Sequence, residues 1–250
     1  MTGAMAGEID INTVAKAYAR WAPVYDLVFG AVFDAGRKAS IAAAERIGGR
    51  ILDVGIGTGI SLTDYSPTHR IVGVDYCEPM LRKAHERVAE HNLAYVEALA
   101  VMDAQHLGFP DAFFDAVVAQ YVITTVPDPE AALDEFARVT KAGGEIILVN
   151  HLGADAGPRR VFEQGFAPVA RRLGWRPEFR WQRLTRWAER HGGVRLLERR
   201  PMPPLGHFSL IRFERLARGG DGGRAGPDSG GRFPLKELHN LASFCQNNNL

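Results

Sequence analysis

The chain has 250 residues, of which 46% are hydrophobic and 24% are charged, and its net charge at neutral pH is +1. These values are ordinary for a globular protein and suit one domain of usual size with room for an appendage. A net charge so close to zero gives no overall signal for nucleic acid or membrane. The two cysteines, Cys77 and Cys245, provide neither a disulfide framework nor metal-ligand spacing, so we expect no metal.

The beginning of the chain carries no recognisable export signal. The first twelve residues, MTGAMAGEIDIN, lack a basic segment followed by an apolar one. No run in the sequence approaches the ~18 consecutive apolar residues of a membrane-spanning helix. We therefore expect a cytoplasmic location.

Helices are expected before the first strand. Apolar and aromatic residues between positions 10 and 21 recur at spacings of three to four, as in an amphipathic helix, and a proline follows. A further helix is expected from about Val32 to Ile47. Residues 1–48 thus form an expected helical region, which can either pack against the sheet edge or form a lid over a ligand.

A glycine-rich turn follows the first expected strand, which begins at Arg50. The apolar run passes into Gly55, Gly57 and Gly59, and a second apolar run ends on Asp75. This pattern predicts strand, glycine turn, helix and strand. Glycines let the backbone approach a ligand closely, and an acid at the tip of the second strand can accept hydrogen bonds from both vicinal hydroxyls of a ribose.

The acid inside the first strand narrows the choice of ligand. A dinucleotide site uses G-x-G-x-x-G and places a pyrophosphate at the helix N-terminus, whereas this chain has G-x-G-x-G with Asp53 two residues earlier. A carboxylate at that position would repel a pyrophosphate but could bind an ammonium group. A glycine turn without any ligand and a nucleotide-phosphate site remain as alternatives.

Strands and helices then alternate along the chain. The expected elements are a helix from near Pro79 to about His91, strands near 95–100, 113–123 and 145–151, and a helix over 130–140. Five alternating strands predict an α/β fold with a doubly wound, parallel sheet and a site at the carboxyl ends of the strands.

The segment from 158 to 200 has a different character, with twelve arginines, four glutamates, and no lysine or aspartate. Trp175, Trp181 and Trp187 interleave with the arginines, which suits anionic lipid headgroups, RNA, or a merely solvated face. A helix ending near His191 and two closing antiparallel strands are expected next. From 217 the composition becomes glycine-rich, which predicts a flexible tail over 217–250.

The turn D-V-G-I-G-T-G resembles motif I of the class I S-adenosylmethionine methyltransferases. The resemblance implies a Rossmann-like, doubly wound sheet, mostly parallel with an antiparallel closing strand, with helices on both faces and an N-terminal helical lid. It implies S-adenosyl-L-methionine as cofactor, S-adenosyl-L-homocysteine as product, and a methyltransferase domain over 49–216 with a basic, aromatic insertion at about 155–190. The implied cofactor residues are Tyr18, Asp53, Gly55, Gly57, Thr58, Gly59, Asp75, Tyr76, Met80, Met102, Asp103, Ala104 and Gln120.

Two of these assignments have structural alternatives without a role in binding. In the family an acid at Asp103 accepts a hydrogen bond from the adenine amino group, but here it can also be a loop or capping carboxylate. Met80 can pack on the adenine or simply fill the core.

Longer segments resemble one branch of these enzymes. YARWAPVYDLVFG, VGIGTGISL, EPMLRKAHERV, GGEIILVNH and PPLGHFSLIRF, within residues 10–216, are similar to the bacterial phospholipid N-methyltransferases. That family methylates the amine of phosphatidylethanolamine stepwise towards phosphatidylcholine. The turn of DNA and protein-amide N-methyltransferases, a nucleophilic cysteine and a catechol-type metal cluster are absent from the sequence.

The resemblance also implies roles at the methyl acceptor. Tyr25 and His151 are the expected catalytic residues, with His151 taking the proton directly or through Tyr25. Tyr18, Trp21 and Tyr121 could hold the methylated ammonium by cation–π contact, and Arg212, or the pair Arg159 and Arg160, could bind the lipid phosphate. The expected substrate-binding residues are Trp21, Tyr121, Asn150, Arg159, Arg160, His207 and Arg212.

We expect the partner to be a phospholipid at an anionic membrane surface, reached peripherally from the inner leaflet by a monomer, with no nucleic acid. The N-terminal amphipathic helix and the arginine- and tryptophan-rich segment are the expected contacts. Two other functions stay open. One is a quinone-biosynthesis C-methyltransferase, which shares the YD-x-x-FG opening. The other is a non-catalytic protein that binds S-adenosylmethionine and is attached to RNA or a complex through the basic region.

Overall fold

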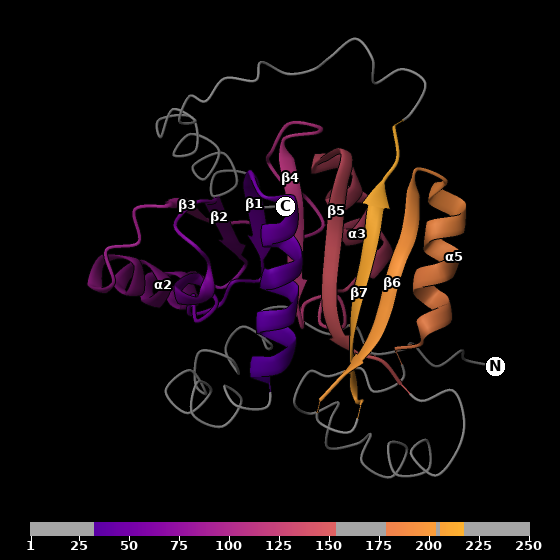
Figure 1. Cartoon of the computed structure of the whole chain (residues 1–250), viewed down its shortest axis with the longest axis horizontal. Helices are drawn as coiled ribbons and strands as arrows, with labels where there is room; N and C mark the ends of the chain where they lie inside the picture. Colours follow the sequence, from indigo (N-terminus) through magenta and orange to yellow (C-terminus); the bar gives the residue numbers. More distant parts are fainter. Residues whose placement is uncertain (1–32, 154–178, 204–205, 218–250) are drawn as a thin grey trace, which may run out of the picture.

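A seven-stranded sheet forms the centre of the computed structural model (Figure 1), which describes residues 33–153, 179–203 and 206–217. The chain enters this sheet through a helix over residues 33–47. The elements that follow are β1 Arg50–Val54, the 3₁₀ helix η1 Leu62–Asp64, β2 Arg70–Asp75, α2 Glu78–Glu90, β3 Val96–Val101, β4 Phe114–Gln120, α3 Pro129–Val139, β5 Thr140–His151, α5 Trp181–His191, β6 Val194–Met202 and β7 Phe208–Arg215.

The strands lie in the order β3-β2-β1-β4-β5-β7-β6. Strands β1 to β5 pair in parallel, and β7 is antiparallel to both of its neighbours, β5 and β6. The winding direction reverses between β1 and β4, and open α/β sheets bind ligands outside the carboxyl ends of the strands at such a point. The predicted doubly wound sheet with an antiparallel closing strand is confirmed.

Each face of the sheet carries its own hydrophobic core. Alternation along β1 sends Leu52 and Val54 to one face, where α3 and α5 pack, and Ile51 to the other, where the helix over 33–47 and α2 pack. Figure 1 shows that helix, in indigo, in front of β1 and β4, with α3 behind the sheet. Both faces of the parallel part are therefore buried, as its apolar strands require.

Two expected elements differ from the sequence prediction. The helix between the glycine turn and β2 is reduced to the three residues of η1, and its C-terminal neighbour Tyr65 is already extended, with ψ at 140°. Pro67 explains part of this, because the residue before a proline avoids the helical conformation.

The fifth strand begins earlier than expected. The sequence predicts a helix over 130–140 and a strand from about 145, yet β5 starts at Thr140 and contains Gly143 and Gly144. The register against β4 jumps here, from Phe114 opposite Thr140 to Ala116 opposite Glu145. A Cβ on Gly144 would lie 2.5 Å from the carbonyl oxygen of Asp115, so this irregular turn needs glycine.

The remaining domain predictions fall largely outside the described residues. These include the helical region before residue 33, most of the basic insertion and the tail after 217, so the predicted domain limits stay predictions. Within the described ranges, no helix combines the length and the apolar character needed to cross a bilayer.

Candidate active site

The glycine turn and Asp75 form one wall of the candidate site. Gly57 and Cys77 each donate a backbone hydrogen bond of 2.8 Å to a different carboxylate oxygen of Asp75. A Cβ added to Gly57, whose φ is +57°, would meet nothing within 4 Å, so the space beside it is open. Burial raises the pKa of Asp75, and the two backbone hydrogen bonds oppose that effect. The carboxylate is thus held in place while lone pairs remain for a ribose.

The other residues of this wall differ in exposure. Gly55 and Gly59 both have positive φ, and a Cβ on Gly55 would lie 2.2 Å from Cγ2 of Val122. Thr58 is buried. Tyr76, which follows Asp75, is 47% exposed.

Asp53 lies deep in the same wall. It is 1% exposed, and its Oδ2 accepts hydrogen bonds from the hydroxyls of Ser61, at 2.9 Å, and Tyr65, at 3.2 Å. Burial raises its pKa to about 7, and these two hydrogen bonds only partly oppose the rise. Neither of these two partners is a cation, so a positively charged ligand would compensate its charge.

Residues from the ends of β2 and β3 form the second part of the site. Met80, Met102 and Ala104 are buried, and the carbonyl of Asp75 accepts a 3.0 Å hydrogen bond from the backbone of Met102. These side chains are apolar and lie close to Asp75 in the fold, as a site for a purine ring beside this acid would require.

Asp103 is tied to a neighbouring loop. Gln105 donates to it from the backbone, at 2.9 Å, and from the side-chain amide, at 3.1 Å to each carboxylate oxygen. The amide oxygen of Gln105 accepts from the backbone of Asp128, which caps α3. Of the two alternatives weighed from the sequence, Asp103 is therefore a loop carboxylate, and the residue that caps the neighbouring helix is Asp128.

The carboxyl end of β4 faces the helix over 33–47. Gln120 donates to Oγ of Ser40, at 3.1 Å, and the hydroxyl of Tyr121 donates to the backbone carbonyl of Phe33, also at 3.1 Å. Tyr121 has a φ of +63°, which is rare for an aromatic residue and marks strain of the kind found at functional sites. A Cβ on Gly36 would lie 2.4 Å from this hydroxyl, so the close approach depends on glycine.

An aromatic cluster surrounds Tyr121. Its ring lies 4.2 Å from that of Phe33 and 5.3 Å from that of Phe208, and Phe33 and Phe208 meet edge to face at 5.3 Å. Neither phenylalanine was singled out from the sequence. Both could have been considered, because Phe33 belongs to the VFDAG segment after the expected lid and Phe208 to the family-like segment.

Two histidines extend this cluster. The ring of His151, at the end of β5, lies 6.3 Å from that of Phe208 and 6.2 Å from that of His207, with the imidazole planes 19° apart. The structure thus brings together the predicted residues Tyr121, His151 and His207, from three different strand ends.

Asn150 points to the opposite face of the sheet. It is fully buried, and its amide donates to Oγ1 of Thr124 at 3.2 Å. Its carbonyl oxygen Oδ1 has no hydrogen-bond partner among the described residues. A donor outside those residues, or a ligand, would supply the missing hydrogen bond to Oδ1.

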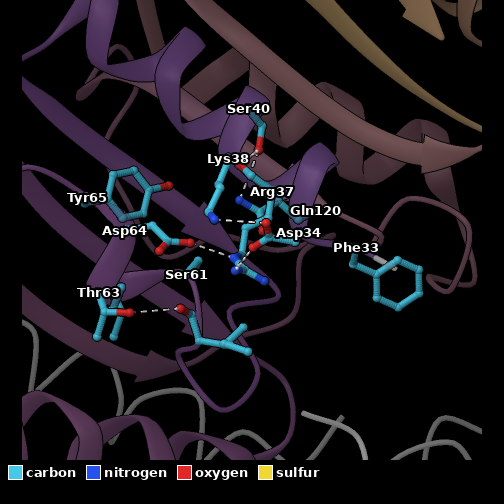
Figure 2. A network of polar contacts seen from close by, with 12 residues as sticks. Phe33, Asp34, Arg37, Lys38, Ser40, Ser61, Thr63, Asp64, Tyr65 and Gln120 are labelled. Atoms are coloured by element: carbon cyan, nitrogen blue, oxygen red, sulfur yellow. Dashed lines mark hydrogen bonds and ion pairs between the residues drawn. The ribbon is translucent and has the colours of Figure 1, made fainter. Parts of the chain in front are cut away.

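Arg37 is a site residue that the sequence analysis missed. Its side chain is 10% exposed, and its guanidinium donates to Asp64, at 2.7 Å, and Asp34, at 2.5 Å, while Lys38 pairs with Asp34 at 2.9 Å. Figure 2 shows it between these carboxylates, in the region that Tyr65 and Gln120 also line. An arginine on an amphipathic helix is usually solvated, so only its contact with η1 reveals it.

Arg212 does not join the site. Its Nε and Nη2 form a two-pronged ion pair with Glu145, both at 2.7 Å, and its Nη1 donates to Glu198 at 3.0 Å. In the register it lies opposite Ile147, four residues before the end of β5. Since two carboxylates already take its donors, the structure does not support Arg212 as the ligand of the lipid phosphate.

Trp187 lies in the core and not at the surface, where a contact with lipid headgroups or RNA would require it. It is 1% exposed, donates from its indole nitrogen to Asp134 at 2.7 Å, and packs edge to face on Phe213. It anchors α5 to the core. Trp181 is partly buried beneath the guanidinium of Arg199, which lies 4.5 Å from its ring.

Several predicted residues cannot be placed. Outside the described residues lie Tyr18, Trp21, Tyr25, Arg159, Arg160 and also Trp175. Where the chain is described, no group of three or more histidine, cysteine or acidic side chains is arranged to hold a metal ion.

Comparison with known proteins places this site in a family. The family described as Methyltransferase domain matches residues 52–148, which contain the glycine turn, Asp75 and Asp103. Phosphatidylethanolamine N-methyltransferase of Cereibacter sphaeroides is 40% identical over 207 residues, covering 83% of this chain and all of that protein. Demethylmenaquinone methyltransferase of a Roseiflexus species is 32% identical and covers 66% of this chain and 73% of that protein.

A solved structure repeats the fold. Phospholethanolamine N-methyltransferase 2 of Haemonchus contortus, in complex with phosphomonomethylethanolamine and S-adenosylhomocysteine, has a TM-score of 0.61 at 17% identity. The match covers 82% of this chain and 58% of that chain, and at this identity it shows the fold alone. With the full length of the first relative matched, the chain belongs to the bacterial phosphatidylethanolamine N-methyltransferases, a family of S-adenosylmethionine-dependent enzymes.

Proposed function

We propose that this enzyme transfers methyl groups from S-adenosylmethionine to the amine of phosphatidylethanolamine, towards phosphatidylcholine. The observation that carries the proposal is the 40% identity over the whole length of a phosphatidylethanolamine N-methyltransferase. The site is compatible with it, because a buried acid and a half-buried acid lie at the ends of β1 and β2, and aromatic rings lie after the end of β4 and at the start of β7.

The described residues suit each part of the cofactor, which supplies an electrophilic methyl group on a sulfonium. Asp75 would bind the ribose hydroxyls, and Met80, Met102 and Asp103 the adenine. Oδ1 of Asp53 would bind the ammonium of the methionine moiety, because the hydroxyls of Ser61 and Tyr65 both donate to Oδ2. Arg37 would bind the carboxylate of the methionine moiety through Nη1, since its bonds to Asp64 and Asp34 use Nε and Nη2. The glycine turn would lie against the cofactor backbone.

The aromatic cluster suits the acceptor. Tyr121, Phe33 and Phe208 offer ring faces to an ammonium whose methyl groups increase with each turnover, and such cations bind well to aromatic rings. Each transfer forms a bond from nitrogen to the methyl carbon, leaves the electron pair of the broken bond on sulfur, and releases one proton from nitrogen. His151 would take that proton, directly or through Tyr25, and holding the neutral amine in line would supply most of the rate.

The lipid phosphate then needs another cation than Arg212. Arg159 and Arg160, with His207, remain the proposed contacts. We further propose that the enzyme is monomeric, lies in the cytoplasm and binds peripherally to the inner leaflet of the cytoplasmic membrane.

Incubation with radiolabelled S-adenosylmethionine and vesicles that contain phosphatidylethanolamine, followed by lipid separation, tests the reaction. We expect label in mono-, di- and trimethylated lipid, in a ratio that shows where methylation stops. Bound cofactor with no labelled lipid would contradict the proposal. The same assay with demethylated quinone precursors then tests the second candidate, which the identity to demethylmenaquinone methyltransferases favours.

Replacement of His151 tests its role as base. His151→Gln should lower kcat with a changed pH profile and little change in cofactor affinity, whereas His207→Gln should act mainly on KM for the lipid. An unchanged pH profile of turnover in His151→Gln would remove this histidine from the mechanism.

A further inference from the structure

The outer strand β6 and helix α5 carry an unusual set of exposed side chains. Between residues 181 and 202 the chain has six arginines, two glutamates, and no lysine or aspartate, although the whole protein has a net charge of only +1. Leu196 and Leu197, neighbours on β6, are each 41% exposed. Besides Tyr76 at the cofactor wall, they are the exposed large hydrophobic residues of the described structure.

One of the six arginines is half-buried and the other five are exposed. Arg183 is bound to Glu130, and five others are exposed at the surface. These are Arg186 and Arg190 on α5 and Arg195, Arg199 and Arg200 on β6. The side chains of Arg195 and Arg200 are 64% and 51% exposed even though each has a glutamate partner.

Protection of an open sheet edge explains only part of this arrangement. Charged residues and a proline, such as Arg195 and Pro201 here, prevent edge strands from pairing with other chains. Two adjacent exposed leucines have the opposite effect, because they raise the gain from covering the strand. The leucines therefore indicate that β6 is covered by something apolar.

The position of β6 links this surface to the active site. Met202, at its end, pairs with Phe208 of β7, which belongs to the aromatic cluster and lies opposite His151. Arg200 and Arg199 lie two and three residues before Met202, which is about 7–10 Å along a strand. The basic part of β6 thus approaches the same edge of the sheet as the site.

We propose that β6 and the adjoining face of α5, defined by Leu196, Leu197 and the five exposed arginines, dock the enzyme on an anionic bilayer. The leucines enter the interfacial region and the arginines contact the headgroups of anionic lipids, which presents the carboxyl edge of the sheet to the membrane. This surface deepens the proposed function and rests on it, because a phospholipid substrate is reached from the bilayer.

A second copy of the chain and an RNA would each fit the surface of β6 and α5 less well than a bilayer does. A second copy paired along β6 would bring Arg195, Arg199 and Arg200 close to the same arginines of its partner, at a cost in repulsion. RNA would pair with the arginines but gain nothing from the leucines. RNA binding also uses exposed aromatic rings on which bases stack, but here Trp187 is buried and Trp181 lies under Arg199.

Vesicle binding of the full-length protein tests the electrostatic part. The probe is phosphatidylcholine vesicles with increasing phosphatidylglycerol, and the variant is Arg199→Gln with Arg200→Gln. Each basic residue near an anionic surface contributes about 1 kcal/mol, so we expect about a tenfold loss of binding, allowing for their partial pairing. Arg46→Gln with Arg82→Gln removes the same charge from exposed sites on other elements and should bind as the wild type does.

A second variant tests the apolar part. Leu196→Ser with Leu197→Ser should weaken binding about fivefold, and this loss should persist at high salt, unlike the effect of the arginines. Both variants should keep turnover on a short-chain phosphatidylethanolamine dispersed as monomers and lose it on vesicles. Loss on monomers and vesicles alike would instead concern the active site and the proposed function.

Three results would overturn the docking proposal. One is unchanged vesicle binding in both variants with wild-type thermal stability. Another is displacement of the protein from vesicles by RNA, with tighter binding to RNA than to the anionic bilayer. The third is a wild-type dimer that becomes monomeric in the leucine variant, while vesicle binding is retained.

Discussion

Buried or half-buried carboxylates occur in two regions on the same side of the sheet, and they are held in different ways. At the ends of β1 and β2, Asp53 and Asp75 accept from hydroxyls and backbone amides, which are neutral. On β5 and β6, Glu145 and Glu198 share the guanidinium of Arg212. Neutral donors orient an anion without cancelling its charge, whereas an arginine does both. The first region is therefore suited to a cationic, hydroxyl-rich ligand, and the second is structural.

The largest effect should come from Asp75. Asp75→Ala removes the acceptor of the ribose hydroxyls and the anchor of Gly57, and hydrogen bonds to a charged group contribute about 1.5–3 kcal/mol each. We expect the Kd for S-adenosylmethionine to rise about 100-fold or more in calorimetry. Asp111→Asn, at an exposed ion pair with Arg138, should leave the Kd unchanged. A Kd of Asp75→Ala equal to that of the wild type would show that the ribose is not bound by Asp75.

Asp53 should make cofactor binding depend on pH. Because burial raises the pKa of this acid to about 7, it is largely protonated below that pH and must lose its proton to bind an ammonium. Affinity should fall about tenfold for each pH unit below 7, with one proton released on binding. Calorimetry in buffers of different ionisation enthalpy measures both, and Asp53→Asn should bind weakly at all pH values with no such release.

The same shift has a consequence for the unliganded protein. A raised pKa means that the folded state holds this proton more tightly than the unfolded chain does. The resulting stability is complete below the ordinary pKa of 3.8 and is lost as the pH rises to about 7. Denaturation of the unliganded protein should show this decline, and Asp53→Asn should reduce it. A slope unchanged by the substitution would show that Asp53 titrates normally.

Arg212 should affect stability and not substrate binding. Arg212→Gln leaves Glu145 and Glu198 uncompensated, and for a partly exposed cluster we expect a loss of about 2–3 kcal/mol in the free energy of unfolding. The added substitution Glu145→Gln should recover part of it. KM for phosphatidylethanolamine should stay as in the wild type. A raised KM with normal stability would restore Arg212 as a ligand of the lipid phosphate and break the contrast between the two regions.

The smallest effect is expected at the rim of the charged region. Arg195 pairs with Glu214, but its side chain is 64% exposed, and exposed ion pairs contribute little. Arg195→Gln should change the free energy of unfolding by about 0.5 kcal/mol or less in denaturant titration. A loss comparable to that of Arg212→Gln would mean that the charges act as one cooperative network.

The sequence by itself determined the fold and the wall of the candidate site that the glycine turn, Asp53 and Asp75 form. A β-rich run, a glycine turn and an acid at the end of the next run are local patterns, and parallel strands bring their carboxyl ends to one edge wherever the chain winds. Asp53, Asp75, Gln120 and His151 could therefore be expected at that edge without coordinates.

Only the tertiary structure decided which charges are compensated. Arg37 contacts Asp64, 27 residues away, and Arg212 contacts Glu145, 67 residues away. The same packing buried Trp187 and left Leu196 exposed. A residue type states the charge or the apolar area of a side chain, but its pairing and burial depend on which distant segment packs against it, and that is a property of the folded chain.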